Sequence, residues 1–149
     1  MAKEFVNRKS AAGRKAYAKI LKRIAEDSVC PFCEPNFLKY HTLPILKKGV
    51  HWIVTENMNP YKGTKTHVLF VHRGHLEDIT KLSPAAAAEL FKLARWIKTT
   101  RKLPGAGLFM RMGDMRYTGA SVAHLHANLI SGAVQDTHEP IAVTLGFKK

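Results

Sequence analysis

The segment Ser121–Ile130, which reads SVAHLHANLI, decides the fold and also raises the question of function. On an extended chain, successive side chains point to opposite faces of the sheet. A strand here directs His124, His126 and Asn128 to one face. The other face receives small and apolar side chains, those of Ala123, Leu125, Ala127 and Leu129. The pattern predicts a strand with one face in the core and the other in a polar site.

Length and composition favour one globular domain. The chain has 149 residues, of which 46% are hydrophobic, which is enough for one substantial core and too little for two. No apolar run reaches the ~20 residues that span a bilayer, and the N-terminus lacks the hydrophobic segment of a secretory signal. We therefore expect a soluble, cytoplasmic protein without a membrane partner.

The charge distribution favours anionic partners. The formal net charge is +13, and eight Lys and Arg residues precede Ile24, opposed there only by Glu4. Such a cluster is typical either of a solvated helix face that keeps a protein soluble or of a nucleic-acid footprint. We predict weak, mainly electrostatic binding of nucleic acid through this basic N-terminus.

The first half of the chain predicts one helix and two strands. Apolar residues at helical spacing predict an amphipathic helix over Ser10–Asp27. A loop follows over residues 34–44. Two runs rich in β-branched and aromatic residues, Val50–Asn57 and Thr66–His72, predict strands.

The second half predicts a long helix and two further strands. Ser83 is the expected cap and Pro84 the first residue of the helix, which ends before the LPGAG turn. A strand over residues 107–112, a polar loop over 113–120 and the strand Ser121–Ile130 follow. Strands clustered around one long helix predict an α+β fold with an antiparallel sheet. We divide the chain into a basic helical extension, residues 1–28, and a single globular domain, residues 29–149.

The two cysteines, Cys30 and Cys33 in the motif CPFC, indicate a metal site or a redox pair. A structural zinc site needs four Cys or His ligands, so a second pair must come from elsewhere. A redox pair needs a cysteine of low pKa at a helix start that follows a strand. Here the pair follows a predicted helix, which favours zinc.

The order of motifs resembles the histidine triad (HIT) superfamily of nucleotide hydrolases and transferases. The resemblance runs from Cys30 to Ile130 through CPFC, ENMNPYKGTKTHVLFVHRGH, GLFMRMGDMRYTGAS and HLHANLI. The family signature is His-φ-His-φ-His-φ-φ, where φ is apolar, and this chain has Asn128 at the third histidine position. Relatives that transfer nucleotides carry glutamine there, which is also an amide. The resemblance implies a HIT-like fold with a five-stranded antiparallel sheet.

The resemblance also implies a nucleotide site. A neutral imidazole can attack phosphorus without carrying negative charge, and the resemblance makes His126 this nucleophile, flanked by His124 and Asn128. It places Ser121 and the backbone after Gly119 at the phosphate. His67 matches a histidine near the phosphate, and Asn57 matches a ribose-binding position. From their charge, we add Arg111 and Arg116 as candidates for binding a polyphosphate.

Zinc, dimerisation and substrate class follow from the same resemblance. Zinc-bearing relatives imply a site formed by Cys30, Cys33, His75 and His124, and family members usually form homodimers through the long helix and an adjacent strand. The expected activity is hydrolysis or transfer at the α-phosphate of a purine dinucleoside polyphosphate or nucleoside phosphoramidate. The alternatives are a DNA- or RNA-end deadenylating enzyme of the aprataxin kind and a weakly active nucleotide-binding or interaction protein.

Overall fold

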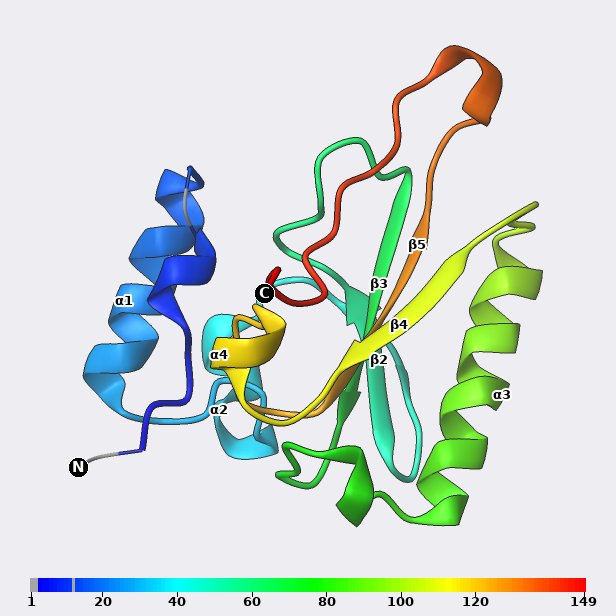
Figure 1. Cartoon of the computed structure of the whole chain (residues 1–149). Coiled ribbons are helices and arrows are strands. Elements are labelled where there is room, and N and C mark those ends of the chain that lie inside the picture. The colour runs from blue at the N-terminus through cyan, green and yellow to red at the C-terminus, as the bar shows by residue number, and fades with distance from the viewer. Residues whose placement is uncertain (1–2, 12) are drawn as a thin grey trace.

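The structure is a computed structural model that describes residues 3–11 and 13–149. Its centre is a five-stranded antiparallel sheet in the order β1-β2-β3-β5-β4. The strands are β1 (Ile45–Lys48), β2 (Trp52–Glu56), β3 (Thr66–His72), β4 (Gly107–Arg111) and β5 (His126–Ser131). Helix α3 (Pro84–Thr100) covers one side of the sheet, and α1 (Lys15–Asp27), α2 (Glu34–Tyr40) and α4 (Met115–Thr118) lie on the other (Figure 1). The predicted α+β class with a five-stranded antiparallel sheet is confirmed.

The main core lies between the sheet and α3. Ser83 caps the helix, because its Oγ accepts a hydrogen bond from the backbone N–H of Ala86 at 3.1 Å. The buried stripe of the helix is the predicted one, formed by Ala86, Leu90, Leu93, Ala94 and Ile97. Leu125, which directly precedes β5, joins this core together with Ala127 and Leu129 of the strand. The predicted apolar face is therefore confirmed for Leu125, Ala127 and Leu129, whereas Ala123 lies outside this core and its N–H donates to the carbonyl of Phe5 at 2.8 Å.

The N-terminal helix starts later than predicted. Residues Arg8–Ala11 form a short 3-10 turn, and α1 begins only at Lys15. Between them Gly13 has φ +78°, a left-handed backbone conformation that interrupts a right-handed helix. The prediction of a continuous helix from Ser10 is wrong for this reason. The predicted boundary at residue 28 coincides with the C-cap of α1 and stays a prediction as a domain division.

The N-terminal segment also shortens the predicted strand at Ser121. Val6 forms an isolated antiparallel bridge with Val122, and the N–H of Asn7 donates to the carbonyl of Ser121 at 2.9 Å. Residues 121–123 thus pair with the N-terminus instead of with the sheet. Consequently β5 begins at His126, and His124 lies just before the strand.

Two predicted loops contain short regular elements. Residues 34–44 include α2, whose Phe37 packs against Ile53, Leu69 and Val71 on the side of the sheet opposite α3. Residues 113–120 include the single turn α4, which is capped by Asp114. The remaining strand of the sheet, β1, is a short and largely exposed element. Within the described part of the chain, no helix has both the length and the apolar character needed to cross a membrane.

Candidate functional site

A cavity of about 270 Å³, here called the central cavity, lies on the side of the sheet opposite α3. The sheet and the loops at its end contribute six predicted site residues to its lining, namely Asn57, Arg111, Gly119, Ser121, His126 and Asn128. Tyr61, which was not predicted, also lines the cavity. The N-terminal part of the chain also lines the cavity, facing the residues that the sheet contributes. Its lining residues are Ser10, Arg14, Tyr17, Ile20, Leu21 and Ile24. The central cavity is therefore closed by residues far apart in the sequence.

His126, the first residue of β5, presents one ring nitrogen to this cavity. Its Nδ1 lies 2.6 Å from the carbonyl oxygen of His124. A carbonyl can only accept, so Nδ1 carries the hydrogen and Nε2 carries the lone pair. Nε2 makes no hydrogen bond to the described residues. Burial lowers the pKa of His126 to about 4, and the charge of Arg111 adds to this effect. The ring is therefore neutral at physiological pH and has a lone pair available.

Asn128 is oriented by His67 on the neighbouring strand. The backbone N–H of Tyr61 donates to His67 Nδ1 at 3.2 Å, so His67 Nε2 is the protonated nitrogen. That nitrogen donates to Asn128 Oδ1 at 2.9 Å. The amide N–H₂ of Asn128 is thereby left as the free donor. Burial lowers the pKa of His67 and keeps this ring neutral.

Asn57 reaches the same ring. Its Oδ1 accepts a hydrogen bond from the backbone N–H of Asn59 at 2.8 Å, so its Nδ2 is a donor. The acceptor on the His67 ring is the lone pair of Nδ1, which lies 3.5 Å from Asn57 Nδ2. Asn57 and Asn128 line the central cavity, whereas His67 lies behind them and is buried. The structure thus brings these three predicted residues together, with His67 in a supporting position.

Arg111 and the loop Gly119–Ser121 form the polar end of the central cavity. Arg111 Nη1 donates to the carbonyl of Gly119 at 3.1 Å, and Nη2 donates to the hydroxyl of Tyr61. Its Nε is buried and finds no acceptor among the described residues. Gly119 has φ +71° as the C-cap of α4, and a Cβ there would lie 2.9 Å from Cγ2 of Thr144. Glycine therefore suits both the turn and the close approach of the C-terminal segment.

Besides His67, two residues predicted for the nucleotide site do not line the central cavity, namely Arg116 and His124. The guanidinium of Arg116 is exposed and forms an ion pair with Asp114. His124 does not line the cavity, and its Nδ1 belongs to a separate cluster with the cysteines. Only one of the two predicted arginines is therefore in a position to contact a molecule in the cavity.

Sequence reasoning missed the contributions of both chain ends to the cavity. Ser10, Arg14 and Tyr17 enter from the N-terminal segment, and Ala142 and Thr144 enter from the C-terminal one. In Figure 1 the C-terminal segment, drawn in red, returns between the sheet and α1. The helical stripe of Tyr17 and the residues after it did indicate the buried face of α1. Arg14 precedes Tyr17 by three residues, so it lies on the same face of the predicted helix one turn earlier. This spacing is the only feature of the local sequence that indicates a place for Arg14 in the cavity.

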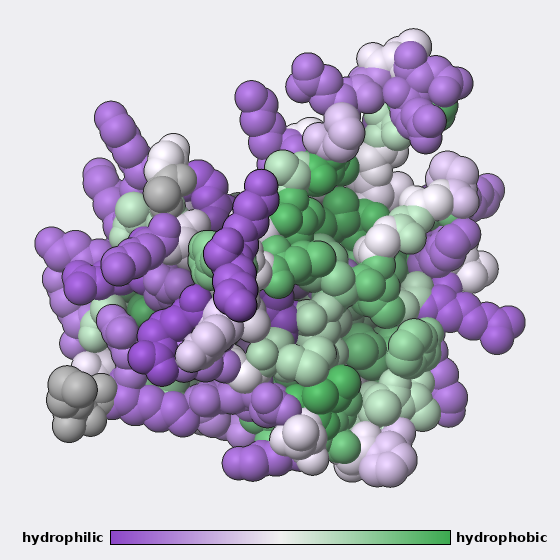
Figure 2. All heavy atoms as spheres, in the orientation of Figure 1, coloured by the Kyte–Doolittle hydropathy of each residue, from purple (hydrophilic) through white to green (hydrophobic). Residues whose placement is uncertain are grey.

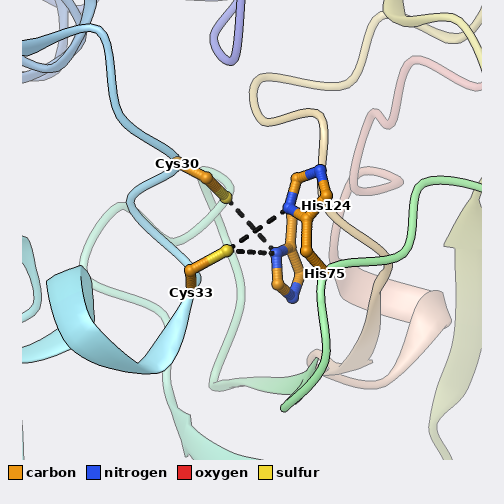
Figure 3. Close-up of side chains that lie close together, drawn as sticks. All are labelled: Cys30, Cys33, His75 and His124. Carbon is orange, nitrogen blue, oxygen red and sulfur yellow. Dashed lines mark hydrogen bonds between the residues drawn. The ribbon is translucent and has the colours of Figure 1, made fainter.

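The four predicted metal ligands come together in a second cluster (Figure 3). Cys30 Sγ lies 3.3 Å from His124 Nδ1, and Cys33 Sγ lies 3.3 Å from His75 Nδ1 and 3.8 Å from His124 Nδ1. All four candidate ligand atoms lie within 4.8 Å of one another. Tetrahedral zinc, with bonds of about 2.0–2.3 Å, separates its ligand atoms by roughly 3.3–3.8 Å. The spacing of this cluster fits such an ion.

The outer contacts of the two histidines suit metal binding. His124 Nε2 donates to the carbonyl of His72 at 2.6 Å, and His75 Nε2 lies 3.0 Å from a carboxylate oxygen of Glu77. In each ring the hydrogen is on Nε2, so the lone pair of Nδ1 faces the sulfur atoms. Burial raises the pKa of the Cys30 thiol to about 12, so this sulfur needs a nearby cation to become a thiolate at neutral pH.

Fold, cavity and cluster together define a histidine triad type of protein. Residues 47–134 match the model of the HIT domain, so the chain belongs to the HIT domain family. The HIT-like fold expected from the sequence is confirmed. No curated protein matches the sequence significantly.

Solved structures show the same fold. A histidine triad nucleotide-binding protein from Candida albicans is 15% identical, with a TM-score of 0.60 over 81% of this chain and 87% of that one. A HIT family hydrolase from Clostridium thermocellum is 22% identical, with a TM-score of 0.56 over 74% and 95%. A zinc-bound histidine triad family protein from Mycobacterium smegmatis is 17% identical, with a TM-score of 0.58 over 72% and 78%. At these identities the likeness concerns the fold.

Proposed function

We propose that this protein is a nucleotidyl hydrolase or transferase that acts at the α-phosphate of a purine nucleotide conjugate. The observation that carries the proposal is the free Nε2 of a neutral His126 in a cavity that also holds Arg111 and Ser121. The substrates that fit are a dinucleoside polyphosphate and a nucleoside phosphoramidate.

The reaction proceeds in two displacements at phosphorus. His126 Nε2 donates its lone pair to the α-phosphorus, and the bond from phosphorus to the leaving oxygen or nitrogen breaks with its electrons going to the leaving group. A polyphosphate departs as an anion, whereas the nitrogen of a phosphoramidate takes up a proton from solvent and departs as a neutral amine. The nucleotide is then bound covalently to His126. Water, or another phosphate acting as acceptor, attacks the same phosphorus, the N–P bond breaks, and the imidazole is neutral again. In hydrolysis the proton of the water passes to solvent.

The neighbouring residues position the phosphate. The amide N–H₂ of Asn128 and the guanidinium of Arg111 are donors toward phosphate oxygens, and the Ser121 hydroxyl lies at the same end of the cavity. Asn57 is suited to a ribose hydroxyl. Because an amide does not titrate, Asn128 acts as a donor and transfers no proton.

We further propose that Cys30, Cys33, His75 and His124 bind one zinc ion. The ligand spacing and the orientation of both imidazoles support this assignment. Four protein ligands leave no open position, so the ion would have a structural role and would join the segment after α1 to the residues that precede β5.

The mechanism is tested with His126→Ala. The variant should lose several orders of magnitude in turnover of a diadenosine polyphosphate and of an adenosine phosphoramidate, because the nucleophile itself is removed. It should retain nucleotide binding, since the other contacts remain. Wild-type protein mixed with substrate, denatured rapidly without acid and analysed by mass spectrometry should carry a nucleotidyl adduct on His126.

The matched control is His51→Ala, which removes a histidine that does not line the central cavity and should leave turnover unchanged. Full activity of His126→Ala, or an adduct on another residue, would contradict the mechanism. Adenylylated DNA is included as a substrate, since preferential turnover of this molecule would favour the end-deadenylating alternative.

A further inference from the structure

One wall of the central cavity lies outside the region that defines the family. Ser10, Arg14 and Tyr17, called here the N-terminal wall, line the cavity that contains His126. The match to the HIT domain begins at residue 47. The chemistry at His126 does not require these residues, so their presence in the cavity calls for a separate explanation.

The N-terminal wall is fixed relative to the proposed phosphate site. Ser10 Oγ and Ser121 Oγ are hydrogen bonded at 2.8 Å. The backbone of Asn7 donates to the Ser121 carbonyl at 2.9 Å, and Val6 bridges to Val122. Ser121 is in turn near the start of β5 in sequence. The segment that precedes α1 is therefore held beside the polar end of the cavity.

Arg14 brings a second guanidinium to this end. One of its nitrogens donates to the Ser10 carbonyl at 2.9 Å, and its Cζ lies 4.5 Å from the centre of the Tyr17 ring. No carboxylate among the described residues forms an ion pair with Arg14. A guanidinium has five N–H donors, so most of those of Arg14 are available.

The permanently charged residues in the described lining of the cavity are all positive. This lining includes Arg14 and Arg111 and contains neither Asp nor Glu. Two permanent cations without a counter-charge favour an anionic occupant, and a guanidinium fits the oxygen atoms of a phosphate well. Figure 2 shows hydrophilic residues gathered over α1, and the exposed basic residues of this helix are Lys15, Lys19, Lys22 and Arg23.

The polar and apolar parts of the N-terminal lining lie at different points along α1. A helix rises about 1.5 Å per residue, so Ile24 lies roughly 15 Å along the axis from Arg14. Ile20, Leu21 and Ile24 line the cavity together with Phe32 and suit an apolar ring such as a nucleobase. Arg14 stands at the opposite end, beside Ser121.

We propose that Arg14 binds the anionic leaving group of the substrate and makes the site selective for polyphosphate over amine leaving groups. This inference rests on the proposed function. Both substrate classes give the same nucleotidyl-histidine intermediate, and they differ only in the leaving group. The departing phosphate chain of a dinucleoside polyphosphate is an anion that can accept hydrogen bonds from Arg14. The amine released from a phosphoramidate carries no negative charge.

The test is Arg14→Gln, assayed with a diadenosine polyphosphate and with an adenosine phosphoramidate that releases a neutral amine. We expect kcat/KM for the polyphosphate to fall by about 10- to 100-fold, the range for loss of a hydrogen bond to a charged group. The value for the phosphoramidate should stay within about twofold, since the other contacts are kept. Arg14→Lys should restore part of the loss. Arg23→Gln, which removes the same charge from the exposed face of α1, is the matched control and should change neither value.

An equal loss with both substrates would assign Arg14 a structural role and overturn the inference, and so would no loss with either. The proposed function is tested separately by the adduct on His126, which Arg14→Gln should still form from the phosphoramidate. If wild-type protein forms no adduct from either substrate, the proposed function fails; if the adduct forms and Arg14→Gln does not discriminate, only this inference fails.

Discussion

The cysteine and histidine ligands of the proposed zinc site differ in how firmly they are held before any ion binds. His124 is oriented by the carbonyl of His72 and is buried, and Cys30 beside it is also buried. Cys33 is more exposed and lies at the N-cap of α2. Cys33 is therefore the ligand whose replacement disturbs the surrounding packing least.

The assignment of these four residues as zinc ligands can be tested by metal analysis and thermal unfolding. Protein purified without chelator should contain one zinc ion per chain, and chelation should lower Tm by about 10 °C, because the free energy of ligand binding contributes to folding. Cys33→Ser should contain less than one zinc ion, and its Tm should respond little to chelator. Wild-type protein that contains no zinc, or whose Tm is unaffected by chelator, would contradict the assignment.

The predictable part of the candidate site consists of residues with local signals. His126 and Asn128 follow from period-two spacing on a strand, and the cysteine pair follows from its own motif. Arg14 could not be placed in this way, because its position depends on Ser10 meeting Ser121 across 111 residues of sequence. Arg116 is the opposite case. It is close to the histidine motif in sequence, but its side chain forms an ion pair with Asp114 and does not line the cavity.

Among the elements, α3 and the β1–β2 turn are joined by one carboxylate. Glu89 accepts hydrogen bonds from the backbone N–H groups of Val50, His51 and Trp52 at 2.8, 2.7 and 3.0 Å. Burial acts to raise the pKa of Glu89, but these donors outweigh it, and the pKa lies below its usual value. The ionised form is therefore the one that stabilises the fold.

Glu89→Gln should lower the free energy of unfolding by about 2 kcal/mol at pH 7, since an amide cannot accept all three hydrogen bonds. In chemical denaturation, the difference from wild type should be full above the unfolded-state pKa of about 4.3 and decrease as pH falls through the lower folded pKa. Glu26→Gln, at an exposed position on α1, is the control and should cost little. A pH-independent difference would contradict this account.

Element length explains which elements the sequence predicted. Helix α3 has 17 residues, a cap and a complete apolar stripe, so its local signals agree. Helix α2 has only seven residues, and its place is determined by Phe37 packing on the sheet. Strand β1 has four residues, which are mostly exposed and give no alternation. Short elements of this kind depend on tertiary contacts that local patterns do not contain.

At the scale of the whole molecule, β4 is one of the two edge strands of the sheet, the other being β1. Strand β4 is at the end of the sheet order, next to α3. Phe91 of α3 is 67% exposed and Leu108 of β4 is 37% exposed, and the two line one hollow of the surface. Figure 2 shows hydrophobic residues gathered over β4 and the adjoining part of α3. An unpaired strand next to exposed apolar side chains is typical of a surface that associates with another chain.

We expect this surface to form the homodimer that the family resemblance implies. Wild-type protein should have a solution mass of twice 16.7 kDa by light scattering after gel filtration. Phe91→Glu should shift the mass to that of one chain, because a charge buried in the interface is left without a partner. Leu38→Glu makes the same kind of change on α2, at a residue that is 70% exposed on the other side of the sheet, and should stay dimeric. A monomeric wild type, or a Phe91→Glu variant that remains dimeric, would show that the exposed face of α3 and β4 is not the interface.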